Sequence, residues 1–305
     1  MQRKLTDRRG GPRTRTVAVR VGLWMSIAVW AALGLGCALH KKANVAGAAA
    51  LVEDVARASN RQTDLRVIRE GMPAYLMLMD GMIEAWPDND RLLIAAAQAY
   101  ASFASAFVAE DDAYRSALLG RSKRYALEAL ALRGIEEPLT APFEAFEAAV
   151  QRADRQDLPF IFWAGSCWGN WAAAHMSSIE AMAELPRVEA LMRRALALDE
   201  GYYHGGPHLF MGIWYAARPR VAGGSLERAR AHFEKALELG QGKFLMAHVT
   251  YAEYYARKAM DRELFTSLLE KALATPAGIV PELTLLNTVA HQKAARLLEQ
   301  ADEFF

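Results

Sequence analysis

The sequence predicts an all-α fold in which about four degenerate helical hairpins form a solenoid, with extra helices at its flanks. The most regular hairpin lies in residues 223–274, where Leu226, Ala229, Phe233 and Ala236 recur every three or four positions. This spacing places the four side chains on one face of a helix, and the small Ala residues beside the large Phe let a second helix pack closely. No stretch of useful length alternates between apolar and polar residues, so no strand is expected.

The hairpin pattern repeats along the chain. Ala-Leu pairs that start at residues 129, 195, 236 and 272 are separated by 66, 41 and 36 residues, against a tetratricopeptide period of about 34 residues. We expect each pair to lie on the second helix of a hairpin, whose first helix carries a small residue at Ala97, Gly169, Gly212 or Ala252. Loop insertions such as residues 218–222 would explain the longer spacings. Because one hairpin cannot bury its own apolar face, several must stack.

The elements outside the repeats are also expected to be helical. Residues 41–60 are typical of a tether that runs into an Ala-rich first helix, and residues 64–85 of an amphipathic helix kinked at Pro73. Pro87 and Asp88 should close that helix and cap the next one. The chain should continue with a turn at residues 136–138, a short helix to about Gln151, a break at residues 276–281 and a final helix over residues 283–300.

The N-terminus is typical of an exported lipoprotein. Seven basic residues in the first 20 positions precede an apolar run over residues 21–35, which is short for a membrane span of about 20 residues and favours a signal peptide. Gly34-Leu35-Gly36-Cys37 then resembles a lipobox. We therefore expect a lipoprotein signal peptide over residues 1–36, lipidation of Cys37, a tether and first helix over residues 37–62, and a single solenoid domain over residues 63–305. An ordinary signal peptide or a retained anchor is the alternative.

Cleavage before Cys37 would change the charge of the chain. The removed segment carries seven basic residues and Asp7, so a net charge of +1 becomes about −5 in the mature protein. An acidic chain is poorly suited to polyanions, and we expect no nucleic-acid partner. Cys167 is the only other cysteine and lies among aromatic residues, so it is expected to be a core thiol without a disulfide partner.

Two groups of residues imitate a catalytic or a metal site. Residues 165–169, Gly-Ser-Cys-Trp-Gly, fit a nucleophile elbow, but that motif needs a doubly wound sheet, which the sequence does not predict. His204 and His208 have the spacing of two metal ligands on a helix, but Gly-Gly-Pro separates them, so a turn with one histidine capping a helix is the better interpretation. We expect no enzyme, no metal site and no cofactor.

An aromatic-rich stretch supplies the first candidate binding residues. Its members are Trp163, Trp168, Trp171, Tyr202, Tyr203 and Trp214. Aromatic side chains are enriched in binding sites, but a stripe at helical spacing more often packs in a core, and both interpretations stay open. Trp168 lies off the line that joins Trp163 and Trp171. At least one of these three tryptophans should therefore face a cavity or a loop.

Three strings in the second half of the chain carry a family resemblance. They are Leu185-Pro186-Arg187-Val188-Glu189-Ala190 with the following Arg194 to Asp199, Pro219 with the helical pattern described above, and Ala252-Glu253-Tyr254-Tyr255-Ala256 with residues 261–287. From about Leu158 to its end, the sequence resembles the T component of tripartite ATP-independent periplasmic (TRAP) transporters. The resemblance implies a tetratricopeptide lipoprotein in the periplasm that binds the substrate-binding P component. It leaves open direct binding of a transported organic acid or hydrophobic ligand, and a homotrimer.

The resemblance also implies where a binding groove lies. In tetratricopeptide proteins, the first helix of each hairpin lines the groove with the residues three before and one after its small residue. Here these residues are Ile94, Gln98, Ser166, Asn170, Leu209, Ile213, Val249 and Glu253, to which we add Trp163. Under the alternative hypothesis, the same groove binds a peptide of an envelope-assembly partner, and the protein is a lipoprotein scaffold without a transport role. Ala38 after the lipidated cysteine favours the outer over the inner membrane, if enterobacterial sorting rules apply.

Overall fold

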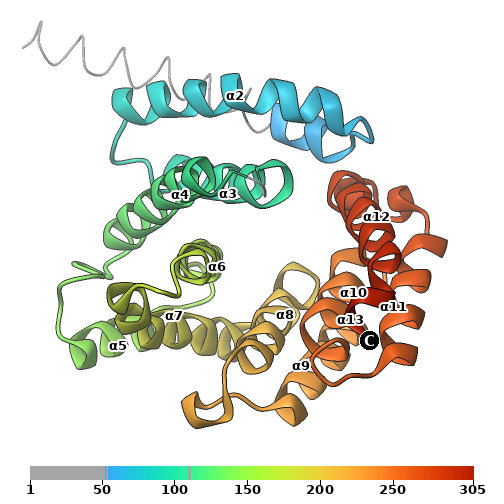
Figure 1. Cartoon of the computed structure of the whole chain (residues 1–305). Helices are drawn as coiled ribbons and strands as arrows, with labels where there is room; N and C mark the ends of the chain where they lie inside the picture. The colour runs from blue at the N-terminus through green and yellow to red at the C-terminus, as the bar shows by residue number, and fades with distance from the viewer. Residues whose placement is uncertain (1–51, 53, 109–110) are drawn as a thin grey trace, which may run out of the picture. The chain divides into compact units, whose positions relative to one another are not determined.

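All regular secondary structure in the part that the structure describes is helical, as the sequence predicted. This computed structural model describes residue 52, residues 54–108 and residues 111–305, so the predicted signal peptide and Cys37 lie outside the described residues. The α-helices are α2 (Leu65–Ala85), α3 (Asp90–Phe107), α4 (Asp112–Leu132), α5 (Phe143–Arg152), α6 (Leu158–Ala174), α7 (Ile179–Leu198), α8 (Tyr202–Ala217), α9 (Leu226–Leu239), α10 (Leu245–Tyr251), α11 (Arg262–Ala274), α12 (Thr284–Glu299) and α13 (Ala301–Phe304) (Figure 1). A π-helix, η2 (Ala252–Ala256), continues α10, and the 3-10 turns are η1 (Arg220–Ala222), η3 (Ala277–Ile279) and η4 (Pro281–Leu283).

Four pairs of helices form the hairpins that the sequence predicted. They are α3 with α4, α6 with α7, α8 with α9, and α10–η2 with α11, and the members of each pair pack together. Successive pairs also touch, because α4 packs on α6, α7 on α8 and α9 on α10. The alanines of the four Ala-Leu landmarks are at most 1% exposed: Ala129, Ala195, Ala236 and Ala272. This arrangement is consistent with a solenoid whose hairpins share one core.

The small residues of the first helices lie where helices come closest. A Cβ atom added at Gly169 would lie 2.7 Å from the ring of Phe210, and one added at Gly212 would lie 2.9 Å from the ring of Phe233. Both distances are shorter than a carbon–carbon contact allows. A larger residue at either position would therefore separate the helices.

The longest spacing between landmarks, from residue 129 to residue 195, contains an inserted helix. Helix α5 lies between the first two hairpins in sequence and packs against α7 (Figure 1). Arg187 of α7 donates a hydrogen bond to the carbonyl of Ala141 at 2.5 Å, and its guanidinium lies 5.1 Å from the centre of the Phe146 ring. The insertion is therefore fixed to the second hairpin.

Side-chain caps define where the hairpin helices begin. Backbone N–H groups in the first turns donate to the side chains of Asp111, Ser178, Ser225 and Asp261. For α3, Oδ1 of Asn89 accepts the N–H of Leu92 at 3.1 Å. The predicted cap at Asp88 is wrong by one residue, because the helix begins at Asp90 and Asn89 occupies the position before it.

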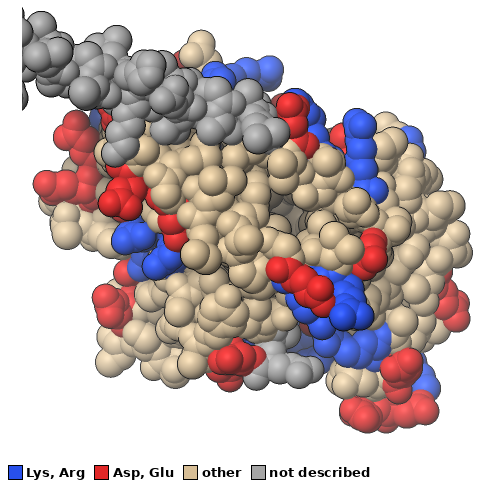
Figure 2. Space-filling view, turned by 90° about the horizontal axis from the view of Figure 1, so that it is seen from above, with Lys and Arg blue, Asp and Glu red and all other residues tan. Residues whose placement is uncertain are grey.

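Helix α2 is a single helix that contains Pro73, the site of the predicted kink. It buries Leu76 and Met79, whereas Met77 and Leu78 on its other side are 74% and 52% exposed. Figure 2 looks onto the molecule from the α2 side, and outside the grey atoms uncharged residues cover most of this face. Within the described part of the chain, no helix combines the length and the apolar character that crossing a membrane requires.

The C-terminal helices pack back onto the hairpins. Helix α12 contacts α10, α11 and also α2, and Arg61 forms an ion pair with Glu282 at 3.1 Å. The terminal aromatic residues Phe304 and Phe305 place their rings 6.0 and 5.2 Å from that of the fully buried Phe265. The chain from Leu51 to Phe305 forms one compact unit.

Candidate functional site

The start of α8 contains a left-handed turn. Tyr203, His204 and Gly205 have φ angles of 48°, 59° and 80°, a conformation that non-glycine residues rarely adopt and that costs energy. Packing explains the turn. A Cβ at Gly205 would lie 3.1 Å from the backbone of Ala236 in α9, and one at Gly206 would lie 2.7 Å from the ring of Phe162 in α6. The sequence predicted a turn here, but not its handedness.

This turn presents Tyr203 to an aromatic cluster that joins three hairpins. The ring of Tyr203 lies 4.8 Å from that of Trp163, 5.9 Å from that of Phe162 and 5.9 Å from that of Phe244. The contacts of Tyr203 with Trp163 and Phe244 are edge-to-face, the geometry that aromatic pairs prefer. Burial raises the pKa of Tyr203 to about 12, so its hydroxyl stays protonated at neutral pH.

The two interpretations of the aromatic stretch apply to different residues. Trp168 is fully buried, and its Nε1 donates to Oε2 of Glu184 at 2.6 Å. Trp163 is half-buried within the aromatic cluster, and Trp171 is half-buried beside a cleft described below. The cleft beside Trp171 agrees with the expectation that at least one of the three tryptophans faces a cavity or a loop.

The predicted groove residues divide into exposed and buried positions. Asn170 is exposed, and five further groove residues are half-buried: Gln98, Ser166, Leu209, Ile213 and Glu253. Ile94 is 6% exposed and Val249 is 0% exposed. In this conformation these two side chains contribute to the core and cannot reach a partner.

The first helix of the fourth hairpin departs from regular α geometry. It becomes π-helical over residues 252–256, which contain Glu253, and π-helical turns are frequent at functional sites. Oε2 of Glu253 lies 2.6 Å from Nζ of Lys293 in α12. Helix α12 therefore meets the groove position of this hairpin, an interaction that no local sequence pattern signals.

A cleft lies outside the predicted groove. It has a volume of about 610 Å³ and lies between α4, the loop that follows it and the end of α6, with Lys123, Leu127, Leu139 and Trp171 in its lining. Nζ of Lys123 lies 2.5 Å from Oε2 of Glu184 and 3.4 Å from the centre of the Trp171 ring. The ammonium group is thus both ion-paired and in a cation–π contact. Sequence periodicity assigned α4 only a packing role and missed this cleft.

The two groups that imitate a catalytic or metal site have other roles. Residues 165–169 lie inside α6, and burial raises the pKa of the Cys167 thiol to about 12, so it is not a reactive thiolate. Nδ1 of His208 lies 2.9 Å from Nδ1 of His232, and Nε2 of His208 lies 3.3 Å from Oε2 of Glu200. In the part of the chain described, no group of three or more His, Cys, Asp or Glu side chains is arranged to hold a metal ion.

The stacked helical hairpins define an all-α protein whose arrangement is consistent with a helical-repeat solenoid. Residues 61–305 match the model of one family, the TRAP transporter T-component. A protein of Treponema pallidum (strain Nichols), described as uncharacterized, is 26% identical over 272 residues, which are 83% of this chain and 84% of the relative. The chain belongs to the TRAP transporter T-component family. Members of that family are accessory components on the periplasmic side of the transporters, and the family is not an enzyme family.

Proposed function

We propose that this T component binds the substrate-binding P component of its TRAP system through the first helices of its hairpins. Family membership supports a role beside the transporter. The exposed Asn170, one turn along α6 from the half-buried Ser166, supports a contact surface on the second hairpin. The half-buried Leu209 and Ile213 of α8 would extend it onto the third hairpin, and the surface would then mix polar and apolar groups.

The aromatic cluster at Trp163 and Tyr203 lies beside this surface and gives it a rigid border. Aromatic side chains contribute much of the binding energy at protein interfaces, because they bury a large area with few rotatable bonds. The left-handed backbone at Tyr203 is maintained by close packing of Gly205 against α9. Strained backbone that surrounding packing maintains is often found at binding sites. This turn is the observation that carries the proposed location.

The proposal includes the anchor and the ligand that the sequence suggested. Acylation of Cys37 would hold the protein on a membrane in the periplasm, with the outer membrane favoured. The surface around Trp163 has the mixed polar and apolar character that an organic acid or a hydrophobic ligand requires. A homotrimer is part of the same proposal.

A binding assay with the P component encoded in the same genome tests the proposed surface. Gln98→Ala with Asn170→Ala should weaken association at least tenfold, while the melting temperature stays nearly unchanged, because truncation of surface polar residues costs little stability. Gln151→Ala on the exposed side of α5 is the matched control and should bind as the wild type does. Wild-type affinity in the double variant would reject this surface.

The alternative scaffold function makes a different prediction in the same assay. A lipoprotein scaffold would show no affinity for the P component, and its pull-down would instead recover an envelope-assembly protein that binds the same first helices. Wild-type protein without measurable affinity for the P component would therefore overturn the transport role itself.

A further inference from the structure

Two neighbouring turns each present an exposed apolar side chain. Val221 in the α8–α9 turn is 100% exposed, and Met260 in the η2–α11 turn is 65% exposed. Helix α8 contacts η2, and Nζ of Lys258 donates to the carbonyl of Ala216 at 2.5 Å. The two turns therefore lie side by side at one edge of the third and fourth hairpins.

The backbone of both turns is tightly held. The N–H of Gly224 donates to the carbonyl of Pro219, and the N–H of Ser225 to that of Tyr215, each at 3.0 Å. Met260 has a φ of 56°, a left-handed conformation that is unfavourable for a methionine. The fold thus keeps a strained methionine at the surface, where its side chain adds little to the core.

Cations surround both apolar tips. Arg218 and Arg220 precede Val221, and Arg257 and Lys258 precede Met260. Arg218 lies 3.7 Å from Glu189 and 3.7 Å from the centre of the Trp214 ring. Among the described residues, no acidic side chain forms an ion pair with Arg220, Arg257 or Lys258. The guanidinium of Arg257 stacks on the ring of Phe304, and Nζ of Lys258 donates to the carbonyl of Ala216.

The acidic groups near these turns are largely engaged elsewhere. Glu253 pairs with Lys293, and the side chain of Asp261 accepts the N–H of Leu264 as the cap of α11. Glu227 and Glu263 stand in the first turns of α9 and α11, where the amide groups of the helix favour a negative charge. Arg220, Arg257 and Lys258 therefore place positive charge that is not ion-paired next to the exposed apolar groups.

A hollow of about 430 Å³ lies between the end of α8 and residues 253–258. Its lining consists of Ala216, Ala217, Glu253, Tyr254, Arg257 and Lys258. The end of α8 forms one side of the hollow and residues 253–258 form the other, so that Arg257 and Lys258 lie beside the groove residue Glu253, which is itself paired with Lys293. A hollow of this size can accept a phosphate-bearing headgroup.

We propose that the α8–α9 and η2–α11 turns bind the surface of an anionic phospholipid bilayer. Val221 and Met260 enter the interface, and the cations at positions 220, 257 and 258 contact headgroup phosphates. Exposed apolar side chains beside cations suit the interface of an anionic bilayer, where apolar groups insert and cations are attracted to the headgroups. The basic and apolar N-terminal segment of the sequence indicates export to a membrane-bounded compartment, so a bilayer is within reach. The proposal does not depend on binding of the P component.

A fluorophore placed on one turn at a time tests the proposal. In a Cys37→Ser background the buried Cys167 does not react, so Val221→Cys, Met260→Cys and the control Ile279→Cys can each be labelled singly with an environment-sensitive dye. Ile279 is a suitable control because it is apolar and 42% exposed but lies in η3. The full chain is mixed with vesicles of phosphatidylethanolamine and phosphatidylglycerol, or of phosphatidylcholine alone. All variants share the same N-terminal segment, so only local insertion distinguishes them.

We expect dye at positions 221 and 260 to shift its emission to shorter wavelength with the anionic vesicles, and dye at position 279 to stay unshifted. Added salt and the charge reversal Arg220→Glu with Lys258→Glu should abolish the shift, whereas the control Arg66→Glu on α2 should not. Equal shifts at all three positions, or a shift that survives charge reversal, would overturn the proposal. So would dye that responds to the P component and not to vesicles, which would assign the turns to a protein partner.

Discussion

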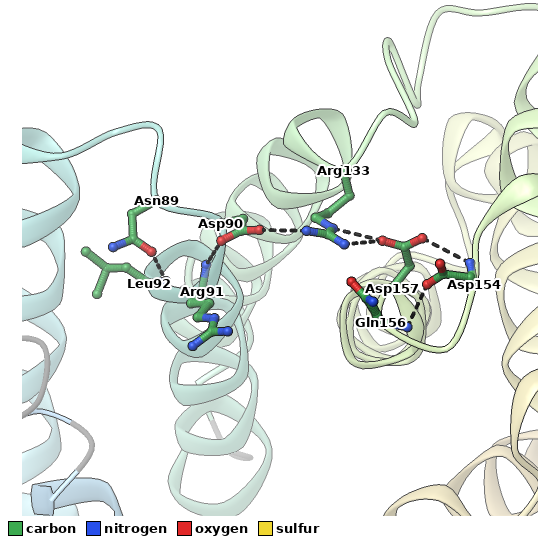
Figure 3. Close-up of polar contacts among 8 residues, drawn as sticks. All are labelled: Asn89, Asp90, Arg91, Leu92, Arg133, Asp154, Gln156 and Asp157. Atoms are coloured by element: carbon green, nitrogen blue, oxygen red, sulfur yellow. Dashed lines mark hydrogen bonds and ion pairs between the residues drawn. The ribbon is translucent and has the colours of Figure 1, made fainter.

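Arg133 at the end of α4 donates two hydrogen bonds to one oxygen of Asp157, the residue before α6. Its Nε and Nη2 lie 2.8 and 2.6 Å from Oδ1 of Asp157 (Figure 3). Nη1 lies 3.5 Å from Oδ2 of Asp90 in α3, and Oδ2 of Asp157 accepts the N–H of Asp154 at 3.0 Å. One guanidinium group therefore joins the first hairpin to the second across the inserted α5.

Removal of the acceptor should uncouple these two hairpins. Asp157→Ala leaves Arg133 with the longer contact to Asp90 as its remaining ion pair, and we expect a loss of about 1–3 kcal/mol in the free energy of unfolding. Arg133→Met should cost less, because its stem can still pack near the ring of Phe160, 5.0 Å from the guanidinium. Urea denaturation measures both, with Arg91→Met as the exposed control. A cost for Asp157→Ala no larger than that of the control would contradict this role.

The stacked pair of Phe233 and Tyr251 predicts where the core is most sensitive. Phe233 is fully buried, and its ring lies 5.0 Å from that of Tyr251 at an angle of 14°. Phe233→Ala should cost about 3–5 kcal/mol, as other buried aromatic truncations do, whereas Phe233→Leu should cost less. Binding of a partner should fall only in proportion to the unfolded fraction. Calorimetry and a binding assay on the same samples check this, and loss of binding in a fully folded variant would place Phe233 in the site.

The left-handed turn predicts opposite effects at adjacent positions. Gly205→Ala adds a Cβ 3.1 Å from the backbone of Ala236 at a φ of 80°, and we expect it to destabilise by about 1–3 kcal/mol. His204→Gly relieves a non-glycine residue at a φ of 59° and should stabilise by about 0.5–1 kcal/mol. Thermal unfolding followed by circular dichroism measures both. The same sign for both variants would mean that backbone strain does not govern this turn.

Acid should destabilise the protein through His248. This side chain is 1% exposed, burial lowers its pKa to about 4, and its Nε2–H donates to the carbonyl of Gly242 at 3.3 Å. Because the unfolded chain binds the proton with a pKa of about 6.5, the unfolded state gains protons first as the pH falls, and stability is lost between about pH 6.5 and pH 4. From pH 7 to pH 5, this histidine accounts for at most about 2 kcal/mol.

A non-titrating replacement isolates that effect. His248→Gln should show a smaller shift of the urea midpoint between pH 7 and pH 5 than the wild type does. His232, whose pKa is also lowered to about 4, chiefly by burial, leaves part of the pH dependence in place. An identical shift in wild type and variant would exclude His248 as a source.

The anchor predicts a change of compartment. If Cys37 is acylated, Cys37→Ser should move the protein from the membrane fraction to the soluble fraction and abolish metabolic labelling with palmitate. Two or more acyl chains hold a protein firmly, because each buried methylene contributes about 0.8 kcal/mol. Fractionation and labelling of cells that express each form make the comparison. Membrane association that persists without label would indicate a retained N-terminal helix.

The sequence by itself determined the helices and their pairing into hairpins. The spacing of Ala229, Phe233 and Ala236 at three and four residues is a local property, and helices with one apolar face must pack in pairs. The same logic located the small residues Gly169 and Gly212, because only a residue without a side chain tolerates an aromatic ring so close to the helix. These features depend on neighbours three or four positions away in the chain, and periodicity reports them.

Only the tertiary structure decided which candidate residues reach the surface. Ile94 and Asn170 occupy groove positions in the same repeat pattern, yet the first is buried and the second exposed. Packing between helices that are far apart in the sequence produces the contact of Lys293 with Glu253 and the left-handed backbone at Tyr203. Local sequence patterns do not report such contacts, because the exposure of a side chain and the strain of its backbone depend on what packs against the residue after the hairpins have stacked.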